Sequence, residues 1–193
     1  MTSSKRHSPA SGKQSCQCWQ CKAFAQCWPE TGMPTRTAIA RIKGGPLAPA
    51  IRGIVIFRDI PGGTEVSADV SGLPPFRPGQ NNKPQIGPHG FHLHENCSCK
   101  VGDPADPFTA AGSHWNPGNQ PHGNHAGDFP ALFSNHGRAK MTFFTDKFNV
   151  DDIIDKTVII HQSPDDYRTQ PTGDSGLRLA CGIVRWARHL SDV

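Results

Sequence analysis

Two histidines stand two residues apart in the stretch GFHLHENCSC, residues 90–99. His92 and His94 alternate there with Phe91 and Leu93, which is the pattern of a β-strand with one apolar face. A strand repeats every two residues, so both imidazoles point to the same side, with backbones about 6–7 Å apart. Imidazoles placed in this way can converge on one metal ion, or they can be two polar residues on a solvated sheet face.

Further metal-ligand residues lie in the segment GSHWNPGNQPHGNHAGDFP and at the end of TVIIH. Imidazole and carboxylate are ligands of tetrahedral zinc, and the segment holds a complete set of four. These four are His114, His122, His125 and Asp128. His161, with His92 and His94, offers an all-nitrogen set that suits Cu(II). For any one of these histidines a merely solvated loop is the better interpretation, but for the whole group a metal centre is.

The elements that must position these side chains are predicted to be short strands. The 193 residues include 20 Gly and 18 Pro with 35% hydrophobic residues, which favours short strands and long loops over helices. Pro61-Gly62-Gly63 supplies the turn of a hairpin within residues 51–73. The other predicted strands lie within residues 37–44, 91–95, 137–145, 155–161 and 177–184.

Two long segments, residues 96–130 and 163–176, show almost no periodicity. Loops of such length inside a compact domain are usually functional. Together with the strands they predict an all-β antiparallel sandwich or barrel.

Four blocks of this sequence resemble the copper–zinc superoxide dismutases, and the bacterial type most closely. The blocks are GPHGFHLHENCSC, AGSHWNPGNQPHGNHAGDFP, VIIHQSPDDY and GLRLACGIV, and they occur in family order across residues 35–186. The resemblance implies an eight-stranded antiparallel Greek-key β-barrel with two long functional loops. It also implies a reaction in which two superoxide ions become oxygen and hydrogen peroxide, with Cu(II)/Cu(I) cycling beside a structural zinc.

The resemblance divides the ligands between two metals that share one bridging imidazolate. The copper ligands it implies are His92, His94, His114 and His161. The zinc ligands it implies are His114, His122, His125 and Asp128. Because only two residues separate His122 from His125, the zinc loop is shorter than in many relatives, and His125 must still reach the metal.

Two further residues match family positions beside the metals. Asp165 matches an aspartate that links a copper-ligand histidine to a zinc-ligand histidine, here His92 and His122, and so fixes both rings. Arg178 matches an arginine beside copper that attracts the anion. Both roles are implied by the resemblance.

The resemblance also implies a disulfide between Cys99 and Cys181. Closing a ring of roughly 80 residues would stabilise the fold by ~4–5 kcal/mol in the chain-entropy model. Cys97 stands where relatives usually have glycine. It is either a free buried thiol or a competitor for the disulfide, and the first interpretation is favoured.

Residues 1–33 are interpreted as an appended basic segment, ahead of a dismutase-like barrel domain at residues 34–193. Their marked feature is a group of thiols that suit Zn(II) or Cu(I), although reduced cysteines in a flexible tail are an equal alternative. These thiols are Cys16, Cys18, Cys21 and Cys27. The net charge of +4, without a basic helix, makes nucleic acid an unfavoured partner.

Location and partners are predicted less directly. No apolar run approaches the ~20 residues of a membrane span, so no membrane partner is expected. The sequence also shows no secretory signal, which favours the cytoplasm, although bacterial relatives are often exported. Superoxide is the expected substrate, and a homodimer and a copper-delivery partner are left open. The rival functions are a non-enzymatic copper/zinc-binding or copper-storage protein on the same fold, and a copper-only dismutase, which the complete zinc set disfavours.

Overall fold

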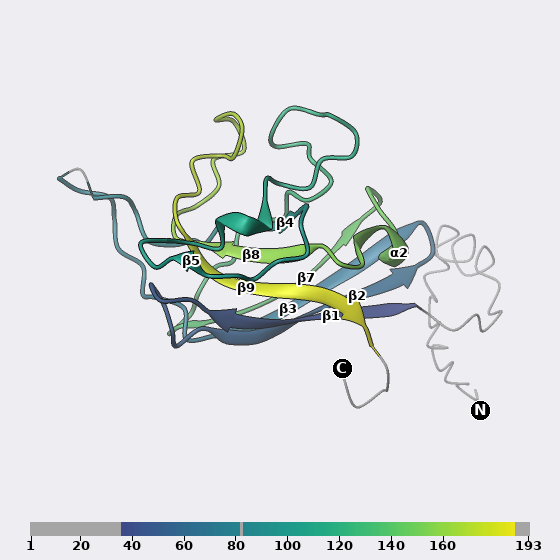
Figure 1. The fold of residues 1–193 in the computed structure, drawn as a ribbon, viewed down its shortest axis with the longest axis horizontal. Helices are drawn as coiled ribbons and strands as arrows, with labels where there is room; N and C mark the ends of the chain where they lie inside the picture. The colour runs from purple at the N-terminus through teal and green to yellow at the C-terminus, as the bar shows by residue number, and fades with distance from the viewer. Residues whose placement is uncertain (1–35, 82, 188–193) are drawn as a thin grey trace, which may run out of the picture. The chain divides into compact units, whose positions relative to one another are not determined.

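The computed structural model describes residues 36–81 and 83–187, which form an antiparallel β structure (Figure 1). Seven strands make one sheet in the order β4-β8-β9-β1-β2-β3-β7. They are β1 (Thr37–Gly44), β2 (Arg52–Ile60), β3 (Gly63–Ser71), β4 (Phe91–His94), β7 (Arg138–Thr145), β8 (Thr157–His161) and β9 (Arg178–Trp186). The remaining elements are the two-stranded ribbon β5 (Gly102–Asp103) and β6 (Asp106–Pro107), the 3₁₀ turn η1 (Thr109–Ala111) and the single-turn helix α2 (Val150–Ile153).

The predicted all-β antiparallel fold is confirmed, and β1 has the predicted bounds. Alternation explains the success. In β3, Val66, Ala68 and Val70 are buried, while the residues between them are half-exposed. The predicted turn residues 61–62 join β2 to β3, whose register runs from Arg52 opposite Ser71 to Ile60 opposite Gly63.

The main sheet has seven strands, one fewer than the family resemblance implies. Residues 128–135 take the place of the eighth, but within the described chain they make isolated bridges instead of a ladder. His89 pairs with Leu132 and Asn135 pairs with Arg138, so the segment runs from the β4 edge to the β7 edge. Pro130 lies inside it and has no N–H to donate, which prevents a continuous ladder there.

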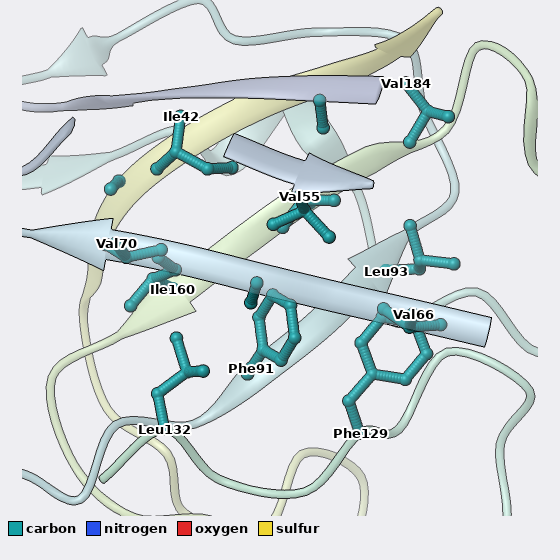
Figure 2. Packing of buried hydrophobic residues seen from close by; sticks show 14 of the residues in the cluster. Ile42, Val55, Val66, Val70, Phe91, Leu93, Phe129, Leu132, Ile160 and Val184 are labelled. Atoms are coloured by element: carbon teal, nitrogen blue, oxygen red, sulfur yellow. The ribbon is translucent and has the colours of Figure 1, made fainter. Parts of the chain in front are cut away.

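The apolar core fills the inside of this sheet (Figure 2). Phe91 of β4 packs on Phe129, with ring centroids 5.1 Å apart, and Phe129 lies 6.4 Å from Phe57 of β2. Leu93 joins the same cluster. Because side chains alternate along a strand, burying Phe91 and Leu93 in the core places His92 and His94 on the opposite face of β4.

No helix in the described ranges is long and apolar enough to cross a bilayer. The segment 1–33 lies outside those ranges. The metal site predicted at its four cysteines therefore stays a prediction, and so does the boundary at residue 34.

Candidate metal centre

His92 and His94 lie on the outer face of β4, yet both are buried, because loop segments cover that face. The covering segment 113–128 pairs with the strand at two points. Isolated antiparallel bridges join His94 to His114 and His92 to Asp128. The first long loop thus brings its own ligand residues directly against those of the strand.

A first group collects four imidazoles, each with a nitrogen within 4.8 Å of the others. Its members are His92, His94, His114 and His161. All four are buried, and Nε2 of His94 lies 3.3 Å from Nε2 of His161. The register between β8 and β9 shifts between Ile160 and His161, and such an irregularity can redirect a side chain at a strand end. This group contains the residues expected to hold copper and is called the copper group below; the second group, described next, is called the zinc group.

A second group collects His114, His122, His125 and Asp128. The three Nδ1 atoms lie close to the Asp128 carboxylate, at 3.0 Å for His114 and 3.3 Å for both His122 and His125. Ligand atoms bonded to one tetrahedral zinc lie about 3.3 Å apart, so this spacing fits that ion.

The short turn between His122 and His125 wraps around the Asp128 carboxylate. The backbone N–H groups of Gly123 and His125 donate to Oδ2 of Asp128 at 2.9 and 3.0 Å. Gly123 has a φ of +88°, a conformation that favours glycine. The two intervening residues therefore suffice to bring His122 and His125 to the same carboxylate.

The hydrogen bonds of the rings decide which nitrogen remains for a metal. Nδ1 of His94 donates to the Gly112 carbonyl at 2.9 Å, and Nδ1 of His161 to the Gly176 carbonyl at 3.1 Å. Among the described residues, four buried ring nitrogens at the two groups have no hydrogen-bond partner. They are Nδ1 of His92, Nε2 of His114, Nδ1 of His122 and Nδ1 of His125. Unpaired buried nitrogens are costly without a ligand, so the donor set fits two bound metals.

Asp165 joins the two groups from behind. Its Oδ2 accepts from Nε2 of His92 at 2.7 Å, and its Oδ1 accepts from Nε2 of His122 at 2.8 Å. Both rings and the carboxylate are fully shielded from solvent. Each ring thereby keeps its proton on the nitrogen that faces Asp165 and turns Nδ1 toward its own group.

Burial keeps His92, His94 and His161 neutral. It lowers the pKa of His161 to about 3, and it lowers the pKa values of His92 and His94 well below the ordinary 6.5. For Asp128, burial acts to raise the pKa, but the hydrogen bond from His114 and the nearby imidazoles outweigh it and bring the pKa to about 2. Neutral imidazoles and an ionised carboxylate are the forms that bind metal.

Arg178 is the cross-strand neighbour of His161 in the pairing of β8 with β9. Its guanidinium donates to the Phe108 carbonyl at 2.6 Å and to the Gly112 carbonyl at 2.8 Å. The same Gly112 carbonyl accepts from His94. The positive charge of Arg178 also contributes to lowering the pKa values of His94 and His161, so it acts on the copper group.

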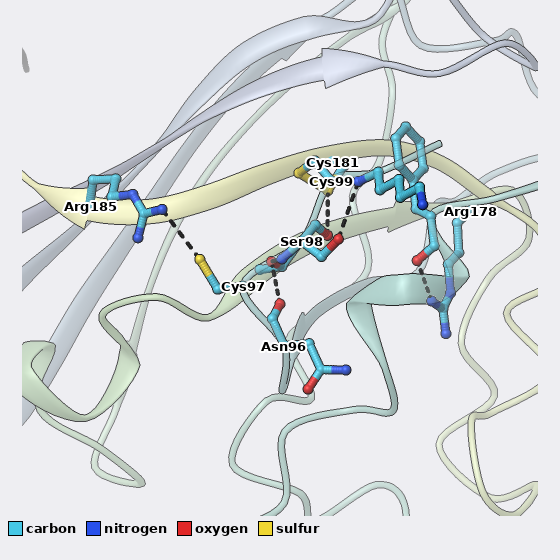
Figure 3. The surroundings of a disulfide bond; sticks show 10 residues. Asn96, Cys97, Ser98, Cys99, Arg178, Cys181 and Arg185 are labelled. Atoms are coloured by element: carbon cyan, nitrogen blue, oxygen red, sulfur yellow. Dashed lines mark hydrogen bonds between the residues drawn. A yellow bond between two sulfur atoms is a disulfide. The ribbon is translucent and has the colours of Figure 1, made fainter. Parts of the chain in front are cut away.

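The disulfide between Cys99 and Cys181 is present (Figure 3). It ties the start of the first long loop to β9, three residues beyond Arg178. Cys97 is free but exposed, so the expectation of a buried thiol is wrong. Its sulfur accepts a hydrogen bond from Arg185 at 3.2 Å, and Figure 3 shows it directed toward that residue.

Several groups that hold the site carry no signal in the sequence. The Gly112 and Gly176 carbonyls orient ligand rings. Every residue has a backbone carbonyl, so the sequence cannot show which ones accept these hydrogen bonds. Gln170 and Lys147 bond to the backbone of His122 and His125 and look like ordinary polar residues. Gly173 lies close to the side chains of Asp165 and His122. Among these groups it alone had a detectable signal, because it lies among turn-forming residues.

The comparison with known proteins agrees with this geometry. Residues 51–184 match the family model described as copper/zinc superoxide dismutase (SODC). The chain belongs to the copper/zinc superoxide dismutase family. The predicted resemblance to that family is therefore confirmed.

Bacterial members of the copper/zinc superoxide dismutase family are similar over most of the chain. A Cu-Zn superoxide dismutase of Deinococcus radiodurans is 35% identical over 152 residues, covering 70% of this chain and 78% of that protein. One of Legionella pneumophila is 32% identical and covers 73% and 82%. One of Brucella abortus is 32% identical and covers 68% and 78%. These relatives bear out the resemblance to the bacterial type.

Proposed function

We propose that this chain dismutates superoxide, converting two superoxide ions and two protons to oxygen and hydrogen peroxide. The observation that carries the proposal is the pair of complete ligand groups that share His114, in a chain of this family. Copper is assigned to His92, His94, His114 and His161. Zinc is assigned to His114, His122, His125 and Asp128.

The chain's contribution is to hold these ligands in place. When bound, copper supplies one-electron chemistry by cycling between Cu(II) and Cu(I), and zinc supplies a redox-silent positive charge. The protein keeps the rings of His92 and His122 oriented through Asp165, and those of His94 and His161 through backbone carbonyls. These hydrogen bonds fix which ring nitrogen each of the four histidines turns toward its metal group.

Arg178 is assigned to anion binding. The guanidinium is half-buried, and two carbonyls fix it. It remains charged, since burial lowers its pKa from a value so high that protonation persists. A fixed cation beside the copper group favours the approach of a small anion and orients it by hydrogen bonding.

His114 is assigned to proton transfer. Its Nδ1 contacts Asp128 in the zinc group, so its Nε2 is the atom that faces the copper group. That Nε2 has no hydrogen-bond partner among the described residues. It is therefore the ring atom available to take up a proton and to give it to the reduced product.

Copper storage without catalysis is the rival function. A storage site needs neither a bridging ligand nor an arginine fixed beside the copper group. The position of Arg178 opposite His161 thus favours the enzyme.

Superoxide decay, followed by pulse radiolysis, tests the proposal on protein loaded with copper and zinc. Loaded wild type should accelerate decay catalytically, and protein loaded with zinc alone should not. His161→Ala should abolish the activity and keep its zinc, whereas the exposed His136→Ala should match wild type. A loaded wild type that binds both metals but shows no catalysis would leave storage as the function. Activity near wild type in copper-loaded His161→Ala would remove His161 from the site.

The homodimer, the copper-delivery partner and the cytoplasmic location are further proposals. They rest on the family resemblance and on sequence alone. Light scattering on the loaded protein tests the dimer, and fractionation of the native cell tests the location.

A further inference from the structure

The side chain of Gln170 forms hydrogen bonds with both backbone polar groups of His122. Its Oε1 accepts from the His122 N–H at 2.8 Å, and its Nε2 donates to the His122 carbonyl at 3.3 Å. The same Nε2 donates to the Arg168 carbonyl at 3.2 Å, which fixes the amide's orientation. One side chain from the second long loop thus occupies both polar groups of a ligand residue in the first.

His122 needs such support because of the short turn that follows it. Only Gly123 and Asn124 separate it from His125, and both histidines must turn Nδ1 toward Asp128. The bond from its ring to Asp165 fixes the ring but not the backbone that carries it.

The opposite end of this turn has the same arrangement. Nζ of Lys147 donates to the His125 carbonyl at 3.1 Å, from the connection between β7 and α2. Both histidines that flank the turn are therefore bonded at their backbone by a side chain from a distant segment. Gln170 makes the more extensive contact of the two, since it bonds both N–H and carbonyl.

We propose that Gln170 is a positioning residue for the zinc group: its amide sets the backbone of His122 so that Nδ1 reaches the metal, and so raises zinc affinity. Gln170 touches neither substrate nor metal. The inference rests on the zinc site assigned above. Gln170 is exposed to water, so its loss should cost about tenfold in zinc affinity, the lower end of the range for groups behind metal ligands.

The test measures metal binding by the full chain with zinc, cobalt and copper. Zinc affinity is measured by competition with a chelator, and the visible spectrum of bound Co(II) reports the geometry of the histidine and aspartate site. Thiolate charge-transfer bands would separate any binding at the N-terminal cysteines. Gln170→Ala should bind zinc about tenfold more weakly and change the Co(II) spectrum, with copper affinity and the melting temperature of the metal-free protein unchanged.

Two further variants sharpen the test. Gln170→Glu keeps an acceptor for the His122 N–H but loses the donor to its carbonyl, so it should recover part of the affinity. Thr172 lies in the same loop, and its exposed side chain makes no hydrogen bond to the described residues. Thr172→Ala should therefore bind zinc like wild type.

Unchanged zinc affinity and an unchanged Co(II) spectrum in Gln170→Ala would overturn the inference. So would an equal loss of zinc affinity, copper affinity and metal-free stability, which would mark Gln170 as a general stabilising residue. If the alanine variant does not fold, the same criteria apply to Gln170→Glu. A wild type whose Co(II) spectrum lacks the histidine and aspartate site would instead refute the proposed zinc group, and this inference with it.

Discussion

At the scale of the residue, the orientation of the ligand histidines is set by the groups that hydrogen-bond their second ring nitrogen. The imidazoles were predictable because the chain has ten histidines and their spacing is unusual. The groups that orient them were less so: Asp165 was found through the family resemblance, while the carbonyls of Gly112 and Gly176 could not be found. A side chain's second partner depends on how loops pack, and packing leaves no pattern in a single sequence.

Arg178 offers a test of anion binding. Arg178→Gln keeps a hydrogen-bond donor but removes the charge, so the dismutation rate at low ionic strength should fall roughly tenfold, about 1.4 kcal/mol in the barrier. Arg178→Lys should have an intermediate dismutation rate, because it keeps the charge but loses the paired hydrogen bonds to the Phe108 and Gly112 carbonyls. Rates are measured against salt, since exposed charges are screened over about 10 Å at 0.1 M. Equal rates and equal salt dependence in Gln and wild type would exclude the role.

Gly173 offers a test of the Asp165 bridge. Its φ is +64°, and an added Cβ would lie 1.9 Å from Oδ1 of Asp165 and 2.4 Å from Nε2 of His122. Gly173→Ala must therefore displace the carboxylate and loosen both metals, at least tenfold for zinc by chelator competition. Gly62→Ala is the matched control, because Gly62 has a φ of +88° with open space around it. Should both variants bind zinc as wild type does, the close approach is not what orients His122.

At the scale of the element, strands with clear alternation were predictable almost to the residue. β1 has the expected bounds, and the turn between β2 and β3 falls where Pro61 and Gly62 put it. The segment 128–135 was not predicted as a bridged, non-ladder connection: no strand was expected there, and Pro130 breaks its pairing. The short β5, β6 and η1 depend on the loop's anchorage to the sheet and have no periodicity of their own.

The disulfide is the anchor of that loop, and its removal should act on copper more than on zinc. It closes a loop spanning 82 residues, so its loss should cost ~4–5 kcal/mol of stability in the chain-entropy model. The loop also carries the carbonyls of Phe108 and Gly112, which hold Arg178 and His94. Denaturant unfolding and copper competition are compared with and without Cys181→Ser, in a Cys97→Ser background that prevents alternative pairing. Unaltered stability and copper affinity would show that the loop keeps its position without the disulfide.

At the scale of the whole described barrel, the core and the metal groups occupy opposite faces of the same strand. Phe91 and Leu93 of β4 enter the core, and the two histidines between and beyond them meet the loops. The site is therefore buried by loops instead of by the core, and its imidazoles are dry without being part of the apolar cluster. This arrangement predicts how the metal-free protein responds to acid.

Stability of the metal-free protein should fall as the pH is lowered from about 6.5 toward 3. Burial lowers the pKa values of His92 and His94 well below 6.5 and that of His161 to about 3, whereas the unfolded chain titrates near 6.5. In this window the unfolded state binds protons that the folded state does not, which favours unfolding. Each such proton adds a slope of about 1.4 kcal/mol per pH unit.

Urea unfolding of metal-free protein between pH 7 and pH 5 measures that slope. His161→Gln removes one titrating group, so its stability should depend less steeply on pH than that of wild type. Identical slopes would mean that His161 is not buried neutral in the metal-free state.

Anomalous X-ray diffraction from crystals of the loaded protein, collected at the copper and zinc edges, tests the two-metal assignment most directly. We expect one copper bonded to His92, His94, His161 and Nε2 of His114, and one zinc bonded to Nδ1 of His114 with the second group's remaining ligands. A barrel that holds a single metal ion, or two metals without His114 between them, would contradict the account.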